Sequence, residues 1–202
     1  TFSAAESRGI DAIVGVANKN STWAFVNRLG FTNLGALETR VIFRKEFSKP
    51  ALAERISKSD LANFVQSNQG SFDDENGFHR VWDDQEINWR LASPSTSFDI
   101  FSLQNALIIS TASKFKSVAV SVILKIFAPR ESPSLSMQKI VNETCKLQNT
   151  NLAIYSGINP SVCSAGIFLP NWLRPAPLNL IIKPLSPKID LQGRTTTTFE
   201  FL

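Results

Sequence analysis

Short apolar runs alternate with polar loops and glycines over the first forty residues of the chain. Residues 12–16 form a continuous apolar run that is typical of a buried parallel strand. The polar residues that follow can cap a helix, which the pattern predicts over 22–29 and which Gly30 would end. Residues 39–43 then predict a second strand. The apolar face of the helix is expected to consist of Trp23, Val26 and Leu29.

The remainder of the chain mixes helical and strand patterns. A helix is predicted over 60–66 and an amphipathic one over 136–147, where four apolar residues share one side. Those residues are Met137, Ile140, Val141 and Cys145. The segment 118–127 is long and rich in β-branched residues, which favours a strand. Further strands are predicted at 98–103, 106–111, 152–155, 178–183 and 195–202.

This order of elements predicts the α/β class with a mixed sheet, and it contains an internal repeat. The dipeptide Ala12-Ile13 precedes Asn18 by the same spacing as Ala153-Ile154 precedes Asn159. Charged and small residues surround Pro50, as in a linker. We therefore divide the sequence into a first unit (1–47), a linker (48–59) and a second domain (60–202).

Charge and hydropathy exclude several classes of protein. The net charge is +4, but the basic residues are scattered and form no stripe with exposed aromatics, so we expect no nucleic-acid partner. No apolar run reaches the roughly 20 residues that a membrane-spanning helix needs. Acidic and basic residues interrupt the first segment, which does not resemble a signal peptide. The expected location is therefore cytoplasmic.

The candidates for metal or thiol chemistry are few. Cys145 and Cys163 belong to no CxxC pair and His79 is the single histidine, so no metal site is predicted. Buried, reduced thiols are the expected state of both cysteines. The acidic runs near 73–75 and 83–86 could offer a base, although such runs are usually solvated surface.

One segment carries a resemblance to a known family. The run Asn18-Lys19-Asn20-Ser21, followed at a fixed spacing by Arg28-Leu29-Gly30-Phe31, resembles the fifth strand and the next helix of acyl-CoA N-acyltransferases of the GNAT superfamily. The resemblance implies a mixed sheet in which two parallel strands splay apart and the pantetheine arm of acetyl-CoA inserts between them. The residues that it implies for cofactor binding are Gly15, Val16, Asn18, Asn20, Ser21 and Phe25. An Asn-Ser loop before a helix also fits a simple cap, and an aromatic on a helix also fits a core position.

The sequence departs from the family pattern in two ways. GNAT enzymes carry a glycine-rich loop that holds the CoA pyrophosphate, and it would lie upstream of Thr1. The corresponding stretch of the second half, 128–134, contains two prolines and no glycine. Many members also place a tyrosine where this chain has Val26, so no catalytic residue is assigned. The resemblance therefore implies a partial first GNAT unit followed by a degenerate second one. The first unit would use acetyl-CoA only when the missing front half is supplied.

Two aromatic–cation pairs are candidates for acceptor binding. Trp89 stands next to Arg90, and Trp172 stands close to Arg174. Such pairs suit a small-molecule amine acceptor of sugar-like or acidic character, for example a cell-envelope precursor. Core tryptophans beside arginines with partly buried stems explain them equally well. Two other functions stay open, namely a non-enzymatic remnant or interaction module, and aminoacyl transfer to cell-wall precursors.

Overall fold

The computed structural model shows two compact units, each formed by two separate stretches of the chain. It describes residues 2–48, 50–68, 77–78, 82–129, 135–163, 165–170, 178–187, 195–196 and 199–200. Unit 1 consists of Thr1–Glu38 and Leu169–Thr195, and unit 2 consists of Thr39–Phe168 and Thr196–Leu202. The chain therefore passes from one unit to the other more than once.

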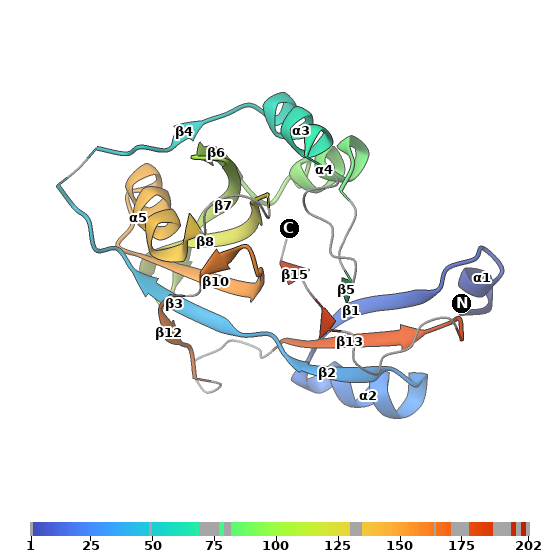
Figure 1. The fold of residues 1–202 in the computed structure, drawn as a ribbon. Helices are drawn as coiled ribbons and strands as arrows, with labels where there is room; N and C mark the ends of the chain where they lie inside the picture. Colours follow the sequence, from blue (N-terminus) through green and yellow to red (C-terminus); the bar gives the residue numbers. More distant parts are fainter. Residues whose placement is uncertain are drawn as a thin grey trace. The chain divides into compact units, whose positions relative to one another are not determined.

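The elements of unit 1 are two helices and three strands (Figure 1), namely α1 (Phe2–Glu6), β1 (Ala12–Asn18), α2 (Lys19–Leu29), β2 (Thr32–Ala36) and β13 (Leu178–Pro184). The helices of unit 2 are α3 (Lys58–Ser67), α4 (Asp84–Leu91) and α5 (Met137–Gln148). Its longer strands are β3 (Thr39–Phe43), β6 (Asp99–Leu103), β7 (Ala106–Phe115), β8 (Val118–Phe127) and β10 (Leu152–Ile158). The two-residue strands are β4 (Glu54–Arg55), β5 (Gly77–Phe78), β9 (Leu135–Ser136), β11 (Val162–Cys163), β12 (Ile167–Phe168), β14 (Thr195–Thr196) and β15 (Phe199–Glu200).

The sheet of unit 1 has the order β1-β13-β2 and is antiparallel throughout. Its core is small, and Ala17, Phe31 and Ile181 are the buried members. Helix α2 ends at Gly30, whose φ of 69° is left-handed, and the N–H of Phe31 then bonds to the carbonyl of Phe25. The predicted helix and its glycine stop are thus confirmed.

Two residues of the predicted apolar face of α2 are exposed, and the third, Val26, is half-buried. Trp23 is 59% exposed and Leu29 is 40% exposed, whereas Phe25 packs against Phe31 with ring centroids 5.2 Å apart. The turn formed by Gly30 brings Phe31 back under the helix, so the aromatic ring after the glycine selects which side of α2 is covered. The 3.6-residue period alone does not contain that information.

The sheet of unit 2 has the order β12-β3-β10-β8-β7-β6-β4. Strands β8 and β10 are parallel and the other neighbours are antiparallel, which confirms the predicted α/β class with a mixed sheet. Helix α5 covers one face, and its predicted apolar residues are all buried. Helices α3 and α4 contribute to a second cluster with Ile109 and Phe127. Since Ile108 belongs to the first cluster and Ile109 to the second, the two clusters lie on opposite faces.

Two strands leave their neighbours in sequence and join the other unit. Strand β3 follows β2 along the chain but pairs with β10, with Phe43 opposite Leu152. Strand β13 pairs with β1, with Pro184 opposite Ala12. The compact units divide the chain at other positions, and the domain boundaries at 47 and 60 stay a prediction. Strands β1 and β10, which both contain Ala-Ile near their start, thus each receive an antiparallel partner from far away in the sequence.

Part of the predicted linker is fastened to α5. The backbone N–H of Lys45 donates to the side chain of Asn142 at 2.9 Å, and those of Leu52 and Ala53 donate to the buried carboxylate of Glu143. Lys146 bonds to the other carboxylate oxygen at 2.7 Å. The polar residues of α5 thus bond to the backbone of Lys45, Leu52 and Ala53, which belong to unit 2.

Candidate functional site

The first candidate site is the free edge of β1 in unit 1. Gly15 and Val16, two predicted cofactor residues, lie in the middle of this strand and pair with Ile181 and Leu180 of β13. β13 occupies one edge of β1 along its whole length. Among the residues that the structure describes, no strand pairs with the other edge. The backbone N–H and C=O groups on that side have no strand partner in the described part of the chain.

The polar turn after β1 is organised as a helix cap. The side-chain oxygen of Asn18 accepts hydrogen bonds from the backbone N–H groups of Asn20 (3.0 Å) and Ser21 (2.9 Å). The hydroxyl of Ser21 lies 3.1 Å from the same oxygen, and the hydroxyl of Thr22 donates to the carbonyl of Asn18. Asn20 is exposed. Asn18 is therefore the N-cap of α2, and the side chain of Ser21 bonds to it. The side chain of Asn20 has no part in the cap.

The remaining predicted residues lie in different surroundings. Phe25 is half-buried in the core of unit 1 rather than lining an open surface. Trp89 and Arg90 belong to α4 of unit 2, where Trp89 is 66% exposed and the guanidinium of Arg90 lies 4.9 Å from its ring centroid. Arg90 also forms an ion pair with Glu86 at 3.0 Å. Arg174, Trp172 and His79 are outside the described residues.

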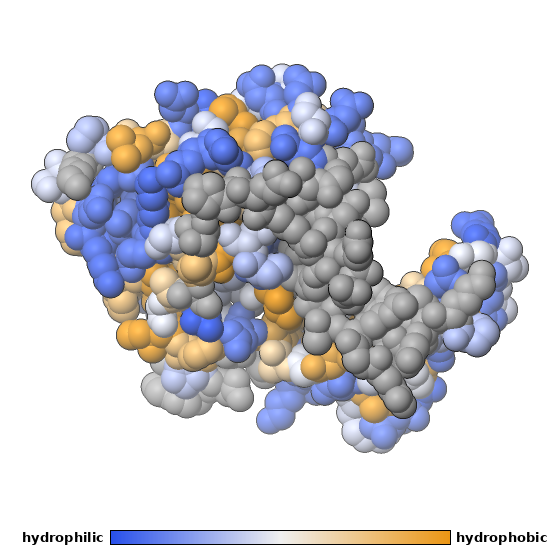
Figure 2. All heavy atoms as spheres, in the orientation of Figure 1, coloured by the Kyte–Doolittle hydropathy of each residue, from blue (hydrophilic) through white to orange (hydrophobic). Residues whose placement is uncertain are grey.

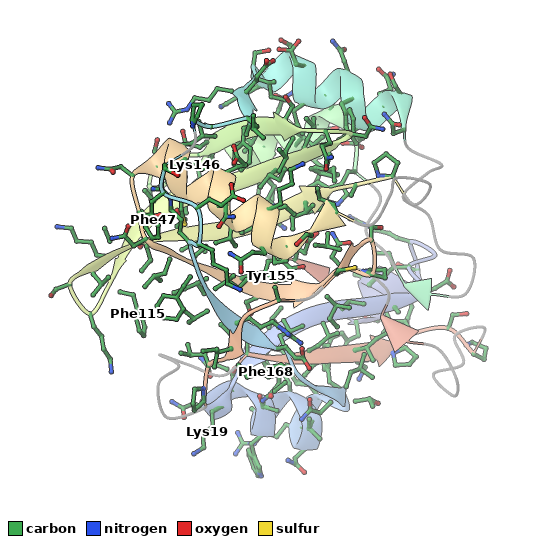
Figure 3. All side chains as sticks on the ribbon, turned by 60° about the vertical axis from the view of Figure 1, so that its left-hand side comes forward. Lys19, Phe47, Phe115, Lys146, Tyr155 and Phe168 are labelled. Carbon is green, nitrogen blue, oxygen red and sulfur yellow. The ribbon has the colours of Figure 1, made fainter. Side chains whose placement is uncertain are left out.

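Sequence reasoning missed a buried polar cluster in unit 2, here called the carboxylate cluster, which consists of Lys125, Tyr155, Asn159 and Glu200. The carboxylate of Glu200 accepts from Lys125 Nζ at 2.7 Å, from the hydroxyl of Tyr155 at 3.0 Å and from Asn159 Nδ2 at 3.3 Å. Figure 3 shows Tyr155 among the strands beneath α5. Two signals were available, because Lys125 is the single charged residue of 118–127 and Tyr155 is the only tyrosine.

Electrostatics make the tyrosine of this cluster a permanent donor. Burial raises the pKa of Tyr155 far above its ordinary value, and the negative charge of Glu200 raises it further. The hydroxyl therefore keeps its proton and donates a hydrogen bond to the carboxylate. A tyrosine held in this way is not poised to act as an acid or a base.

The carboxylate cluster lies where β8 and β10 diverge. The two strands pair in parallel only over Ala153–Tyr155 with Ser121–Ile123. In β8 the register against β7 shifts, so that Lys125 faces Ile109, Ile123 faces Ser110 and Leu124 has no partner. This extra residue is a β-bulge, and bulges bend the strand that carries them. The carboxyl-terminal parts of the two strands, Leu124–Phe127 and Ser156–Ile158, are called the splay below.

The thiols and acidic groups offer no metal site in the described part of the chain. No group of three or more His, Cys, Asp or Glu residues there could hold a metal ion. Cys145 is buried, and burial raises the pKa of its thiol, whereas Cys163 is exposed, contrary to the prediction that both are buried. Cys163 ends the two-residue strand β11, which leaves it little cover. None of the described helices is both long and apolar enough to cross a membrane.

The chain shares its mixed α/β fold with solved structures described as GCN5-related N-acetyltransferases. The chain is similar to two solved structures described as such enzymes, from Anabaena variabilis (TM-score 0.52, 10% identity, 92% of this chain and 48% of that chain) and from Kribbella flavida (TM-score 0.54, 11% identity, 91% and 45%). It is also similar to a probable N-acyltransferase from Enterococcus faecalis (TM-score 0.54, 10% identity, 91% and 48%).

These similarities establish the fold. The chain spans about half the length of each of the three structures. No protein-family model and no curated protein sequence matches the chain.

Proposed function

We propose that the protein acts in acyl-CoA-dependent N-acyl transfer, with acetyl-CoA as donor and a small-molecule amine as acceptor. The observation that carries the proposal is the free edge of β1, followed directly by a polar turn and α2, in a chain with an acyltransferase fold. An extended ligand with amide groups can pair with such an edge as an added strand. The pantetheine arm of CoA is a ligand of this kind.

The chain's own groups suit that arm in part. The backbone of Gly15 and Val16 would pair with its amides, and the exposed side chain of Asn20 could donate or accept one further hydrogen bond. Asn18 and Ser21 contribute less, because their polar atoms already bond within the cap. The thioester of the donor supplies the acyl group, and orientation of the amine toward it is the main task left to the protein.

The acceptor side of the proposal rests on Trp89, Arg90 and Arg174. An exposed aromatic ring with a stacked guanidinium binds sugar-like or acidic groups through apolar contact and charge-assisted hydrogen bonds. A cell-envelope precursor that carries an amine has this chemistry. No side chain of the described residues is assigned as general base.

Paired variants of the polar turn test the cofactor site. In the protein supplied with the front half that carries the pyrophosphate loop, we expect Asn20→Ala to raise the KM for acetyl-CoA about 2- to 12-fold, without a change in melting temperature. This range corresponds to the loss of one hydrogen bond of roughly 0.5–1.5 kcal/mol. Asn18→Ala is the matched control, and the loss of its cap should lower stability by about 1 kcal/mol. Steady-state thiol release with acetyl-CoA and a panel of amines, together with thermal melts, measures both effects.

Three outcomes of these measurements would contradict the proposal. An Asn20→Ala variant that loses stability while its KM is unchanged would mean that the turn is only a cap. Transfer of an aminoacyl group in place of acetyl would move the protein to the alternative transferase class. Absence of CoA binding and of thiol release with every amine would leave a non-enzymatic module.

A further inference from the structure

We propose that the splay of unit 2 is a self-occupied binding site: strand β15 of the same chain lies where an extended ligand arm would lie, and the carboxylate cluster holds it there. Unit 2 then provides no second site for an acyl-CoA. This inference rests on the fold and on the contacts of β15, and not on the proposed catalytic activity.

The position of β15 is defined by bonds to both diverging strands. Its backbone pairs antiparallel with β10, with Glu200 opposite Gly157 and Phe199 opposite Ile158. The carboxylate of Glu200 in β15 accepts a hydrogen bond from Lys125 of β8. Glu200 therefore connects the two strands at the place where they no longer pair with each other.

Asn159, directly after β10, also connects β10 to β8 within the splay. Its side-chain Nδ2 donates to the carbonyl of Ile126 on β8 at 3.0 Å and lies 3.3 Å from the Glu200 carboxylate. Its Oδ1 accepts from the N–H of Ser161 at 3.1 Å. A backbone carbonyl of β8 that an inserted ligand could use is thus already bonded within the chain.

Burial makes this arrangement hard to open. The side chain of Glu200 is 0% exposed and that of Lys125 is 7% exposed. The ammonium group of Lys125 lies 5.1 Å from the ring centroid of Phe127 and 5.7 Å from that of Trp82. If β15 left the splay, Lys125 would lose its counter-charge beside these aromatic rings. Removing one partner of a buried ion pair is far more costly than removing both.

The splay of unit 2 contrasts with the edge of β1 in unit 1. Strands β1 and β10 both contain Ala-Ile near their start. Asn18 ends β1 and Asn159 follows β10, and the side chain of each asparagine accepts from the N–H two residues later. After Asn18 the chain continues as α2, whereas after Asn159 it does not form a helix in the described residues. No described strand pairs with the other edge of β1, whereas β10 pairs with β15 at Gly157 and Ile158.

Charge variants of the ion pair test whether β15 is seated as described. We expect Glu200→Gln to lower the melting temperature by about 5–10 °C and to increase hydrogen exchange at Gly157 and Ile158 about tenfold or more. The double variant Glu200→Gln/Lys125→Met should recover part of the loss, because it leaves no unpaired buried charge. The matched control is Glu54→Gln, which removes an exposed carboxylate from β4 and should change neither quantity.

Hydrogen exchange with coenzyme A tests the occupancy itself. In the unmodified chain, saturating coenzyme A should add no protection to 124–127 or 156–158. Protection there would overturn the inference, and so would a Glu200→Gln variant with unchanged melting temperature and unchanged exchange. Absence of CoA binding anywhere would refute the proposed function but not this inference, since the Glu200→Gln effects do not depend on the cofactor.

Discussion

Replacing Glu143 with leucine is expected to lower the free energy of unfolding by about 3–5 kcal/mol. Glu143 lies on α5 with a side chain that is 2% exposed, and Lys146 beside it is 5% exposed. The substitution leaves the ammonium group buried with the weaker contacts to the carboxylate of Glu46 at 3.7 Å and to the carbonyl of Pro50 at 3.5 Å. It also removes the acceptor for the backbone N–H groups of Leu52 and Ala53. Chemical denaturation of the variant and the unmodified chain measures the difference.

The same carboxylate should make stability depend on pH. Burial raises the pKa of Glu143, but the hydrogen bond from Lys146 and those from Leu52 and Ala53 outweigh burial and hold the pKa below its ordinary value. A lowered folded-state pKa contributes stability that is fully present above the unfolded pKa of about 4.3 and is lost as the pH falls through the folded value. Denaturation midpoints measured below pH 5 should show this loss of stability. In the Glu143→Leu variant, the part of the loss that comes from this carboxylate should be absent.

Two further variants separate charge from packing at this position. Lys146→Met should raise the pKa of Glu143, because it removes the strongest favourable partner of the carboxylate, and the acid loss should begin at a higher pH. The double variant Glu143→Leu/Lys146→Met should be more stable than Glu143→Leu alone. Additive losses, or a Glu143→Leu midpoint equal to that of the unmodified chain, would show that this pair does not hold Leu52 and Ala53 to α5.

The second large effect is expected at Gly166, just before β12. Its φ of 93° is left-handed, and a Cβ built there would lie 2.3 Å from Cγ1 of Ile42 and 2.6 Å from the carbonyl oxygen of Val41. Ile167 pairs with Val41 in the next residue of the ladder, so the backbone cannot withdraw without breaking that pairing. We expect Gly166→Ala to cost about 2–5 kcal/mol, the sum of the conformational and overpacking penalties.

Gly35 provides the matched control for Gly166. Its φ of 118° is also left-handed, but a Cβ there would meet nothing within 4 Å. Gly35→Ala should therefore cost only the conformational part, about 1–2 kcal/mol. Equal losses at the two positions in denaturation experiments would mean that the contact with β3 yields freely and that only the backbone conformation matters.

The sequence predicts local elements of this fold well and their partners poorly. The strand over 118–127 has the predicted bounds, because its β-branched run is continuous, and the predicted buried side of α5 is confirmed. The strand over 39–43 is also present, yet nothing in its residues indicates that it pairs with β10. Pairing across such a distance depends on the whole sheet, and a five-residue strand fits many neighbours.

The candidate site illustrates a second limit of sequence reasoning. An asparagine after a strand can bind a ligand or cap a helix with the same oxygen, and for Asn18 the structure shows the cap. The carboxylate cluster combines residues of β8, β10 and β15, which are separated by long stretches of chain. Lys125 on an apolar strand could have indicated a buried partner, but the identity of that partner as Glu200 required the topology.

The exchange of β3 and β13 determines the order in which the chain can fold. During synthesis, β1 must wait for residues 178–184 before it has its neighbour, and β10 takes up a strand made long before it. Contacts between segments so distant along the chain close slowly, because the entropy of a large loop is lost before the pairing compensates for it. The sheet of unit 1 is therefore completed only after the strands of 39–168 have been made.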